Sequence, residues 1–425
     1  MPPIRFIHAA DLHLDAAFSG LSRDIPADFA ERLRTATFTA FRRLLDLCER
    51  ESPDFLLLAG DVYNQEDASV SAQLALRDGF RRLESLSIPV FLVHGNHDPL
   101  ASRLRSVRWP GNVTVFGELP DAVPVFRKGE GTPLAIIHGA SHASGRETRN
   151  LAALFRRTEA CGLHVGLLHA TPGDADGVAR YAPFSQEDLK ASGMDYWALG
   201  HIHDRREVCR EPLAAYPGCT QGLHINEPGE KGGLLVTAEA RPDGGYAVRT
   251  SFRPLGPAVW KTLDMDLGGA ASLDELENRL RTGLDRAAAE VWSGCEMLLV
   301  RLRLQGRTEL DGLLRKGTTC AELADRLRED GSGVPRIWIK DIDVATRPCV
   351  ERGALLERED LLGEVFRLSE AARTASGLQA LREGPLAPLF AHARAGKALE
   401  PLTDEELARL LDDAESLCLD LLEND

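Results

Sequence analysis

The chain has 425 residues, of which 44% are apolar, so it can bury a large core, and its length suggests about three structural modules. The sequence holds no run of about 18 apolar residues and does not open with a secretory leader pattern, so we expect a cytoplasmic protein without a membrane span. Its eight cysteines contain no CxxC pair, which disfavours a disulfide framework or a zinc knuckle. The net charge of −15 does not indicate nucleic-acid binding, although residues 346–425, with 17 acidic and 9 basic side chains, carry about half of it.

Five apolar segments in the first half of the chain are typical of buried strands, and each ends in residues that can bind metal ions or transfer protons. Gly60 and Gly95 interrupt two of these segments, which places the following polar residues in tight turns. A stretch with apolar residues at helical spacing, roughly 29–50, precedes the second strand. In chain order, the strand-end residues are Asp11 and His13, then Asp61, then Asn96, His97 and Asp98, then His169, and finally His201 and His203.

Seven of these residues offer nitrogen or oxygen atoms that can ligate a metal ion: Asp11, His13, Asp61, Asn96, His169, His201 and His203. His97 is left over. Seven ligands are too many for one ion and suit two ions that share a carboxylate. Asp61 stands alone at its strand end and is the natural bridge. We expect the side chains to converge, because open α/β sheets bind ligands at the carboxyl ends of their strands. The mixture of histidine, aspartate and asparagine favours Mn, Fe or Zn, with Mn²⁺ expected. Two cations about 3.5–4 Å apart would clamp a phosphoryl group and generate hydroxide between them, which predicts phosphate-ester hydrolysis.

The motifs DLH, GDVYN, GNHD and GHIH, with the isolated His169, resemble the five ordered motifs of the calcineurin-like metallophosphoesterases. Within that superfamily, the segments IHAADLHLD, PVFLVHGNHD and YPGCTQGLHINEPGEKGGLLV most resemble the bacterial DNA repair exonucleases of the YhaO and SbcD type. The resemblance is dense in motifs over residues 1 to about 255. It implies a four-layer α/β/β/α sandwich with a dinuclear Mn²⁺ centre that acts as a DNA exonuclease and possibly an endonuclease.

The resemblance also implies a role for each strand-end residue. His97 would protonate the leaving group or steady the pentacovalent phosphorus, and Asp98 would orient it. One metal would be held by Asp11, His13, Asp61 and His203, and the other by Asp61, Asn96, His169 and His201.

Several alternatives stay open at this point. Arg103, Arg105 and Arg108 follow the GNHD turn and could grip DNA phosphates, although a solvated helix face is the simpler interpretation. His224 and Glu227 could line the outer shell of the site, or they could only belong to the segment that leads into a β-hairpin. The same metal site could serve a small-molecule phosphomonoesterase or a cyclic-nucleotide phosphodiesterase. In a different class, the chain could be a non-catalytic scaffold for an ATPase.

The rest of the chain predicts two further regions after a catalytic domain over residues 1–258. Pro254, Gly256 and Pro257 end that domain, because such a cluster cannot continue a sheet. Residues 259–345 show a β-α-β-α-β pattern that resembles the capping domain of these nucleases.

Residues 346–425 predict a helical tail. In it, Thr403 and Glu406 form a capping box. The apolar positions that follow at helical spacing could pack on the chain itself or on a partner, and the resemblance implies an SMC-like coiled-coil ATPase of the SbcC or YhaN type. We expect DNA as the other partner, and a homodimer stays open. The stripe consists of Leu407, Leu410, Leu411, Ala414, Leu417, Cys418, Leu421 and Leu422.

Overall fold

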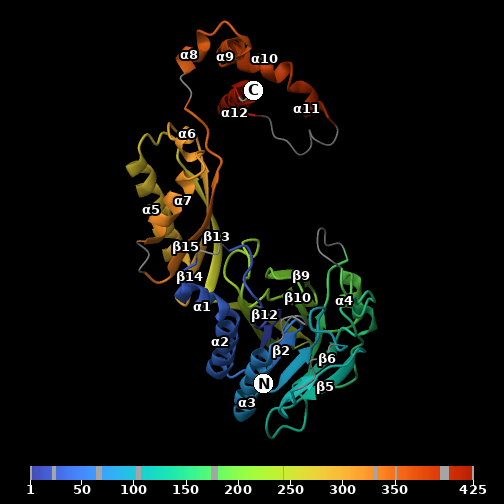
Figure 1. Cartoon of the computed structure of the whole chain (residues 1–425). Helices are drawn as coiled ribbons and strands as arrows, with labels where there is room; N and C mark the ends of the chain where they lie inside the picture. Colours follow the sequence, from blue (N-terminus) through green and yellow to red (C-terminus); the bar gives the residue numbers. More distant parts are fainter. Residues whose placement is uncertain are drawn as a thin grey trace. The chain divides into compact units, whose positions relative to one another are not determined.

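The computed structural model describes residues 2–21, 25–63, 69–101, 107–173, 180–242, 244–329, 333–349, 352–392 and 402–423 (Figure 1). The chain divides into two compact units. The first contains Met1–Asp266, Leu273–Gln305 and Leu313–Ala345, and the second contains Leu267–Ser272, Gly306–Gly312 and Thr346–Asp425. None of the described helices is both long enough and apolar enough to cross a membrane.

The first unit begins with the elements of two sheets. They are β1 (Ile4–Ala9), α1 (Ala27–Arg34), α2 (Ala36–Glu51), β2 (Phe55–Ala59), α3 (Val70–Ser85), β3 (Val90–Val93), β4 (Val113–Val115), β5 (Asp121–Val125), β6 (Ala135–Ala140), η1 (Ala152–Leu154), β7 (Leu163–His169), α4 (Gln186–Ala191), β8 (Tyr196–Gly200), β9 (Arg206–Arg210), β10 (Leu213–Tyr216), β11 (Gly232–Ala240) and β12 (Tyr246–Pro254).

A second series of elements follows in the chain. They are β13 (Ala258–Asp266), α5 (Leu273–Glu290), β14 (Met297–Gln305), α6 (Asp311–Leu314), α7 (Thr319–Glu329), β15 (Arg336–Val344), α8 (Arg352–Leu356), α9 (Leu361–Ala372), α10 (Ala375–Glu383), α11 (Ala387–Ala391) and α12 (Asp404–Glu423).

Two six-stranded sheets form the centre of the first unit. Their strand orders are β12-β11-β1-β2-β3-β4 and β5-β6-β7-β8-β10-β9. Strands β1 to β4 are parallel, with Phe6 opposite Phe55, and strands β6 to β8 are parallel, with His169 opposite Gly200. Because the carboxyl ends of parallel strands meet at one edge of a sheet, each sheet gathers its strand-end turns there.

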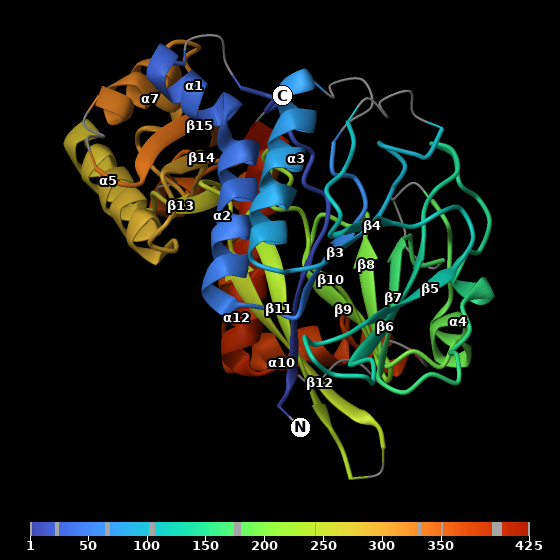
Figure 2. The ribbon, with the colours of Figure 1, turned by 90° about the horizontal axis from the view of Figure 1, so that it is seen from below.

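Both faces of the first sheet are buried, which explains why its strands are continuously apolar. Phe6 faces the second sheet, whereas Ile7 faces α2 and α3, as the two-residue period of a strand requires. Figure 2 shows α2 and α3 side by side along this sheet. The outer face of the second sheet is covered by η1 and α4, through contacts of Trp197 with Phe155 and Leu189. The expected four-layer α/β/β/α sandwich is therefore confirmed.

The helical stretch expected over 29–50 is divided in the structure. Helix α1 ends and α2 begins at Thr35, whose backbone has φ −98° and ψ 3°. The Thr35 hydroxyl donates to the carbonyl oxygens of Glu31 at 3.0 Å and Arg32 at 3.3 Å. This side-chain bonding competes with the helical hydrogen-bond pattern and separates the predicted helical stretch into two helices.

Residues 258–344 contain a three-stranded parallel sheet, in the order β13-β14-β15, with the helices α5 and α7 between its strands in sequence. This is the β-α-β-α-β order expected from the sequence. The buried side chains of Trp260, Leu299 and Trp338 form one cluster with Phe29 and Leu33 of α1. The three-stranded sheet is thus packed against the helical layer of the same unit.

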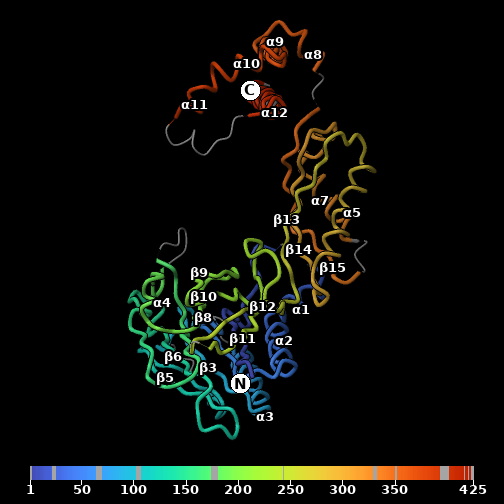
Figure 3. Tube along the Cα trace, turned by 180° about the vertical axis from the view of Figure 1, so that it is seen from behind, coloured from blue at the N-terminus to red at the C-terminus, as the bar shows by residue number. Residues whose placement is uncertain are grey.

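The C-terminal helices of the second unit pack on one another, with α9 contacting α8, α10 and α12 (Figure 3). The capping box is confirmed: the Thr403 backbone N–H donates to Glu406 Oε2 at 2.7 Å, and the Glu406 N–H donates to Thr403 Oγ1 at 3.2 Å. The apolar stripe of α12 is divided by this packing. Leu407 of the stripe is buried, whereas Leu410, Leu417 and Leu421 are 45%, 57% and 65% exposed. Leu419, which is not part of the predicted stripe, is buried instead.

Candidate metal centre

Four of the strand-end residues have a backbone conformation that non-glycine residues rarely adopt. The φ angles of Asp11, His13, Asp61 and His201 are 50°, 41°, 49° and 104°. Such conformations cost of order 1–3 kcal/mol each and are found mainly where function requires a particular side-chain direction. The sharp turns direct these side chains across the ends of the strands instead of along them.

Glycines next to the ligand-type residues allow the two sheets to approach at this edge. A Cβ atom on Gly95 would lie 2.2 Å from Asp61 Oδ1 and 2.8 Å from His169 Nε2. A Cβ atom on Gly200 would lie 1.9 Å from the Ala59 carbonyl oxygen. Any side chain at either position would push apart the groups that the turns bring together.

One cluster of possible ligand atoms comes from β1 and the turn after β8. Asp11, His13 and His203 each offer an atom, and these atoms all lie within 4.8 Å of one another. His203 Nε2 is 3.8 Å from Asp11 Oδ1 and 3.1 Å from His13 Nε2. Two imidazole nitrogens facing one carboxylate are an ordinary donor set for a borderline divalent cation.

A second cluster comes from the ends of β2, β3, β7 and β8. Asp61, His169 and His201 offer atoms that lie within 4.8 Å of one another. The side-chain oxygen Oδ1 of Asn96 lies 3.1 Å from His169 Nε2 and 3.1 Å from His201 Nδ1. This cluster adds an amide oxygen to the carboxylate and the imidazoles.

Asp61 lies between the two clusters. Its Oδ2 atom is 3.3 Å from His169 Nε2 and 4.0 Å from His13 Nε2, which belong to different clusters. Its Oδ1 atom accepts a hydrogen bond from the His97 backbone N–H at 3.0 Å. The carboxylate therefore contacts both groups of ligand atoms and the turn that carries His97.

The buried carboxylates of the two clusters need positive charge near them to stay ionised. Burial opposes the ionisation of Asp61, but the neighbouring His169 lowers the pKa of Asp61 well below its usual range. Burial would lower the pKa of His169, but Asp61 raises it to about 9. Burial and the nearby Asp61 raise the pKa of Asp11. Two buried carboxylates among imidazoles fit divalent cations, whose positive charge would stabilise the ionised carboxylates.

Outer contacts fix the orientation of two histidines. The His169 Nδ1–H group donates to the Ala59 carbonyl oxygen at 2.9 Å, which leaves Nε2 for the cluster. His142 Nε2 lies 2.6 Å from the His169 carbonyl oxygen and supports the same strand end.

His203 is oriented by Glu227. Its Nδ1 atom hydrogen-bonds Glu227 Oε1, and Glu227 Oε2 accepts from the Leu223 N–H at 2.7 Å. Burial opposes ionisation of Glu227, but the hydrogen bond from His203 lowers the pKa of Glu227 to about 2. Of the two readings that the sequence left open for Glu227, the structure favours the outer shell, while His224 Nε2 lies 3.2 Å from the same carboxylate.

His97 and Asp98 have separate environments. His97 is exposed, and its ring lies 5.2 Å from the His13 ring. The buried Asp98 carboxylate accepts from the backbone N–H groups of Gly95 at 2.7 Å and Val62 at 3.1 Å. Among the described contacts no hydrogen bond joins Asp98 to the His97 ring, while His94 Nδ1 lies 3.4 Å from Asp98 Oδ2. The expected role of Asp98 in orienting His97 stays a prediction. Through its backbone contacts, Asp98 holds the turn in place.

The arginines predicted to grip DNA lie mostly outside what the structure describes. Arg103 and Arg105 fall outside the described residues, and Arg108 is exposed. Two other exposed arginines neighbour the clusters. Arg146 follows Gly145, where an added Cβ would lie 3.1 Å from the Asn96 carbonyl oxygen, and Arg180 precedes Tyr181, whose ring lies 5.3 Å from that of His201. No linear motif marks them, because both approach the site through chain segments distant in sequence.

The two-sheet sandwich with paired ligand clusters at its strand ends defines a metallophosphoesterase. Comparison with family models agrees, because residues 4–205 match the calcineurin-like phosphoesterase model and residues 260–347 match the middle domain of the metallophosphoesterase YhaO.

Relatives narrow the assignment further. The chain is 34% identical to the "uncharacterized metallophosphoesterase YhaO" of Bacillus subtilis over 388 residues, which is 90% of this chain and 91% of that protein. It is 27% identical to the DNA double-strand break repair protein Mre11 of Aeropyrum pernix, over 68% of this chain and 69% of that protein. The chain therefore belongs to the YhaO-type family of calcineurin-like metallophosphoesterases, which are metal-dependent phosphoesterases with a dinuclear centre.

Proposed function

We propose that this protein is a Mn²⁺-dependent phosphodiesterase that acts as a DNA exonuclease, with endonuclease activity as a further expectation. The observation that carries the proposal is the position of Asp61 between two clusters of ligand atoms. In this proposal, Asp11, His13, Asp61 and His203 hold one cation, and Asp61, Asn96, His169 and His201 hold the other. When bound, the two cations neutralise the phosphoryl oxygens and activate a water molecule.

The chain's own residues would orient the substrate and supply a proton. His97 is exposed beside His13, and its backbone is tied to Asp61, so its ring can reach a leaving oxygen over the clusters. We assign it the role of proton donor to that oxygen. Glu227 and the Ala59 carbonyl group hold His203 and His169 in the orientation that presents Nε2 to the cations.

DNA as the substrate is supported by two observations. Curated relatives are named as DNA double-strand break repair proteins. Arg146 and Arg180 are exposed, and each adjoins in sequence a residue that lies close to the second cluster. Neither forms an ion pair among the described residues. Unpaired guanidinium groups can contact backbone phosphates on either side of the cleaved bond.

We further propose three regions with separate tasks: a catalytic domain over 1–258, a capping module over 259–345, and a tail over 346–425 that docks on an SMC-like coiled-coil ATPase. The exposed Leu410, Leu417 and Leu421 of α12 support the last assignment, because their spacing places them on one side of a helix.

The decisive test compares substrates on the same protein. Duplex and single-stranded DNA, labelled at the 3′ or the 5′ end, are incubated with Mn²⁺ beside bis-(p-nitrophenyl) phosphate and p-nitrophenyl phosphate. We expect stepwise shortening of DNA and hydrolysis of the diester, both abolished by a chelator. Hydrolysis of the monoester alone would support a small-molecule phosphatase, and no hydrolysis of any ester with two metals bound would support a scaffold.

A paired variant isolates the contribution of the arginines. Replacing Arg146 and Arg180 together by alanine should raise the KM for DNA more than the KM for the small diester, because only DNA has phosphates beyond the cleaved one. The salt dependence of DNA hydrolysis should also become weaker, since fewer counterions are released on binding. Equal effects on both substrates would remove these arginines from the DNA-binding surface.

A further inference from the structure

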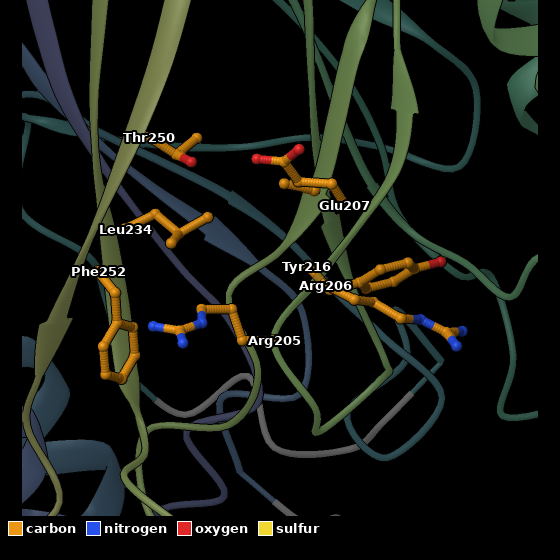
Figure 4. A pocket seen from close by; sticks show the side chains of 8 residues that line it. Arg205, Arg206, Glu207, Tyr216, Leu234, Thr250 and Phe252 are labelled. Carbon is orange, nitrogen blue, oxygen red and sulfur yellow. The ribbon is translucent and has the colours of Figure 1, made fainter.

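A pocket opens between the outermost pairs of strands of the two sheets (Figure 4). The strands β9 and β10 of one sheet and β11 and β12 of the other supply its walls. Its volume is about 250 Å³, the room of roughly eight water molecules. This is enough for a single aromatic ring system.

One wall of the pocket is a stacked pair of flat groups. The guanidinium carbon of Arg205 lies 4.1 Å from the centroid of the Phe252 ring. Arg205 is exposed, and no carboxylate lies within ion-pair distance of it among the described residues. Stacking on Phe252 holds the guanidinium plane in a fixed orientation.

The opposite side of the pocket carries a hydrogen-bond acceptor, the carboxylate of Glu207. In Figure 4 the Glu207 side chain extends into the space that Arg205, Leu234, Thr250 and Phe252 surround. Glu207 is exposed and has no cationic partner among the described residues. An ionised carboxylate only accepts hydrogen bonds. A free phosphate would therefore meet repulsion from Glu207 at the same place where Arg205 attracts it.

The pocket is connected to the metal-ligand clusters in two ways, by residues adjacent in the sequence and by strand pairing within one sheet. Arg205 follows the ligand-type residue His203 by two positions. Leu234 on β11 pairs with His8 on β1, and His8 precedes Asp11 by three residues, which separates them by at most roughly 10 Å of extended chain. The base of a nucleotide next to the cleaved phosphate could reach the pocket over this distance.

We propose that this pocket binds an unpaired nucleobase that has an exocyclic amino group. The base stacks on the wall formed by Arg205 and Phe252, as unstacked bases do on arginine planes and aromatic rings. Its amino edge donates to Glu207, as the amino group of cytosine does to carboxylates in DNA complexes. The inference rests on the proposed function, and it adds that the enzyme selects a single-stranded end with an unpaired base.

The pattern of donors sets an order of preference. Guanine offers two adjacent N–H donors to one carboxylate and should bind most tightly. Adenine and cytosine offer an amino group beside a ring acceptor and should bind less tightly. Thymine has carbonyl oxygens on both sides of its N–H group, so Glu207 should disfavour it.

Nucleosides test the pocket without involving the metals, because they carry no phosphate. Deoxyguanosine, deoxyadenosine, deoxycytidine, thymidine and inorganic phosphate are titrated separately into the full chain with Mn²⁺, and binding is followed by saturation-transfer NMR. We expect deoxyguanosine to bind best and phosphate not to compete with it. Phe252→Ala should weaken deoxyguanosine binding by about 5- to 100-fold, the range for loss of one stacking side chain.

Matched variants separate stacking, recognition and charge. Phe252→Leu keeps apolar volume and should weaken binding as Phe252→Ala does, with the thermal midpoint preserved. Glu207→Gln should reduce the preference for deoxyguanosine over thymidine. Arg205→Ala should weaken binding. Arg210→Ala removes the same charge from an exposed residue at the far end of β9 that does not line the pocket, and it should not weaken binding.

The outcomes distinguish the pocket from the proposed function. Equal binding of all four nucleosides, no binding of any, or competition by phosphate would overturn the base-binding inference. The unaltered protein is assayed with bis-(p-nitrophenyl) phosphate in the same series. Hydrolysis without nucleoside binding would refute the pocket alone, and nucleoside binding without hydrolysis would refute the phosphodiesterase function alone.

Discussion

The strand-end clusters and helix α12 place unusual residues in opposite environments. At the strand ends, polar side chains such as Asp11 and Asp61 are 1% exposed, and their neighbours hold them in strained turns. On α12, apolar side chains such as Leu417 are more than half exposed, although Leu419 two positions later is buried. Burying carboxylates and exposing leucines both cost free energy. The difference teaches that the two regions depart from ordinary burial in opposite directions, which fits our proposals that the first binds cations and that the second docks on another protein.

The largest expected effect comes from removing the carboxylate between the clusters. Asp61→Ala should reduce the content of both metals, because the two cations would repel each other without a shared anion. Mass spectrometry under native conditions should show loss at both sites, and hydrolysis should fall with it. Asp204→Ala, which removes an exposed carboxylate next to His203, is the control and should keep both metals. Two tightly bound metals in the Asp61 variant would rule out the bridge.

His97 tests whether binding and chemistry are separable in the buried region. His97→Asn should lower kcat by about 10²- to 10⁴-fold, the range for loss of a positioned acid. Metal content and DNA affinity should stay close to those of the unaltered chain, since the ring lies beside the clusters and not within them. If the variant lost metal in proportion to activity, His97 would be a ligand.

Glu227 tests the support behind one cluster. Glu227→Gln should weaken metal binding by about 10- to 100-fold at the cluster of Asp11, His13 and His203, because the orientation of His203 is lost. The cluster with His169 has a separate contact to the Ala59 carbonyl group and should keep its affinity. Competition with a chelator of known affinity measures the metal affinity of each of the two clusters. An equal loss at both would mean that Glu227 acts on the whole fold.

The exposed face of α12 can be changed without disturbing its packing. Leu410→Glu combined with Leu417→Glu should abolish co-purification with the ATPase and leave the thermal midpoint nearly unchanged. Leu419→Glu is the matched control, because it places a charge in the cluster of Leu355, Leu362 and Phe366 and should lower the midpoint clearly. Retained ATPase binding by the double variant would place the docking surface elsewhere.

A buried polar pair remote from the metals predicts a pH effect on stability. His138 Nε2 and His164 Nδ1 lie 3.0 Å apart and share a hydrogen bond, and His164 Nε2–H donates to the Ala160 carbonyl oxygen. Burial lowers the pKa of His138 to about 4.

The unfolded chain therefore binds more protons than the folded one between pH 6.5 and about 4, and stability should fall as the pH falls through this window. His138→Gln should remove on the order of 1–3 kcal/mol of that pH dependence, measured by urea unfolding at the two ends of the window. An unchanged slope would show that His138 titrates normally.

The sequence predicted the strands and the strand-end residues well, because each pairs an apolar run with a turn a few residues long. The structure brings the seven predicted ligand residues together, and their roles stay predictions. Reasoning from neighbouring residues in the sequence does not identify the partners of a side chain that are distant in the sequence. Asp98 follows His97 but bonds Val62, which is 36 residues away.

The same limit applies to the other features that the sequence did not predict. The stripe on α12 is continuous in sequence, but only packing against α9 decides which of its leucines are buried. Arg205 immediately precedes β9 of one sheet and Phe252 lies on β12 of the other, so only the arrangement of the sheets forms their pocket.

The central claim is that two cations sharing Asp61 hydrolyse phosphodiesters. The most direct test titrates Mn²⁺ into metal-free protein by calorimetry and follows hydrolysis of bis-(p-nitrophenyl) phosphate in the same samples. We predict two equivalents bound per chain, with turnover appearing only as the second site fills. Saturation at one equivalent, or turnover that persists after complete chelation, would contradict the account.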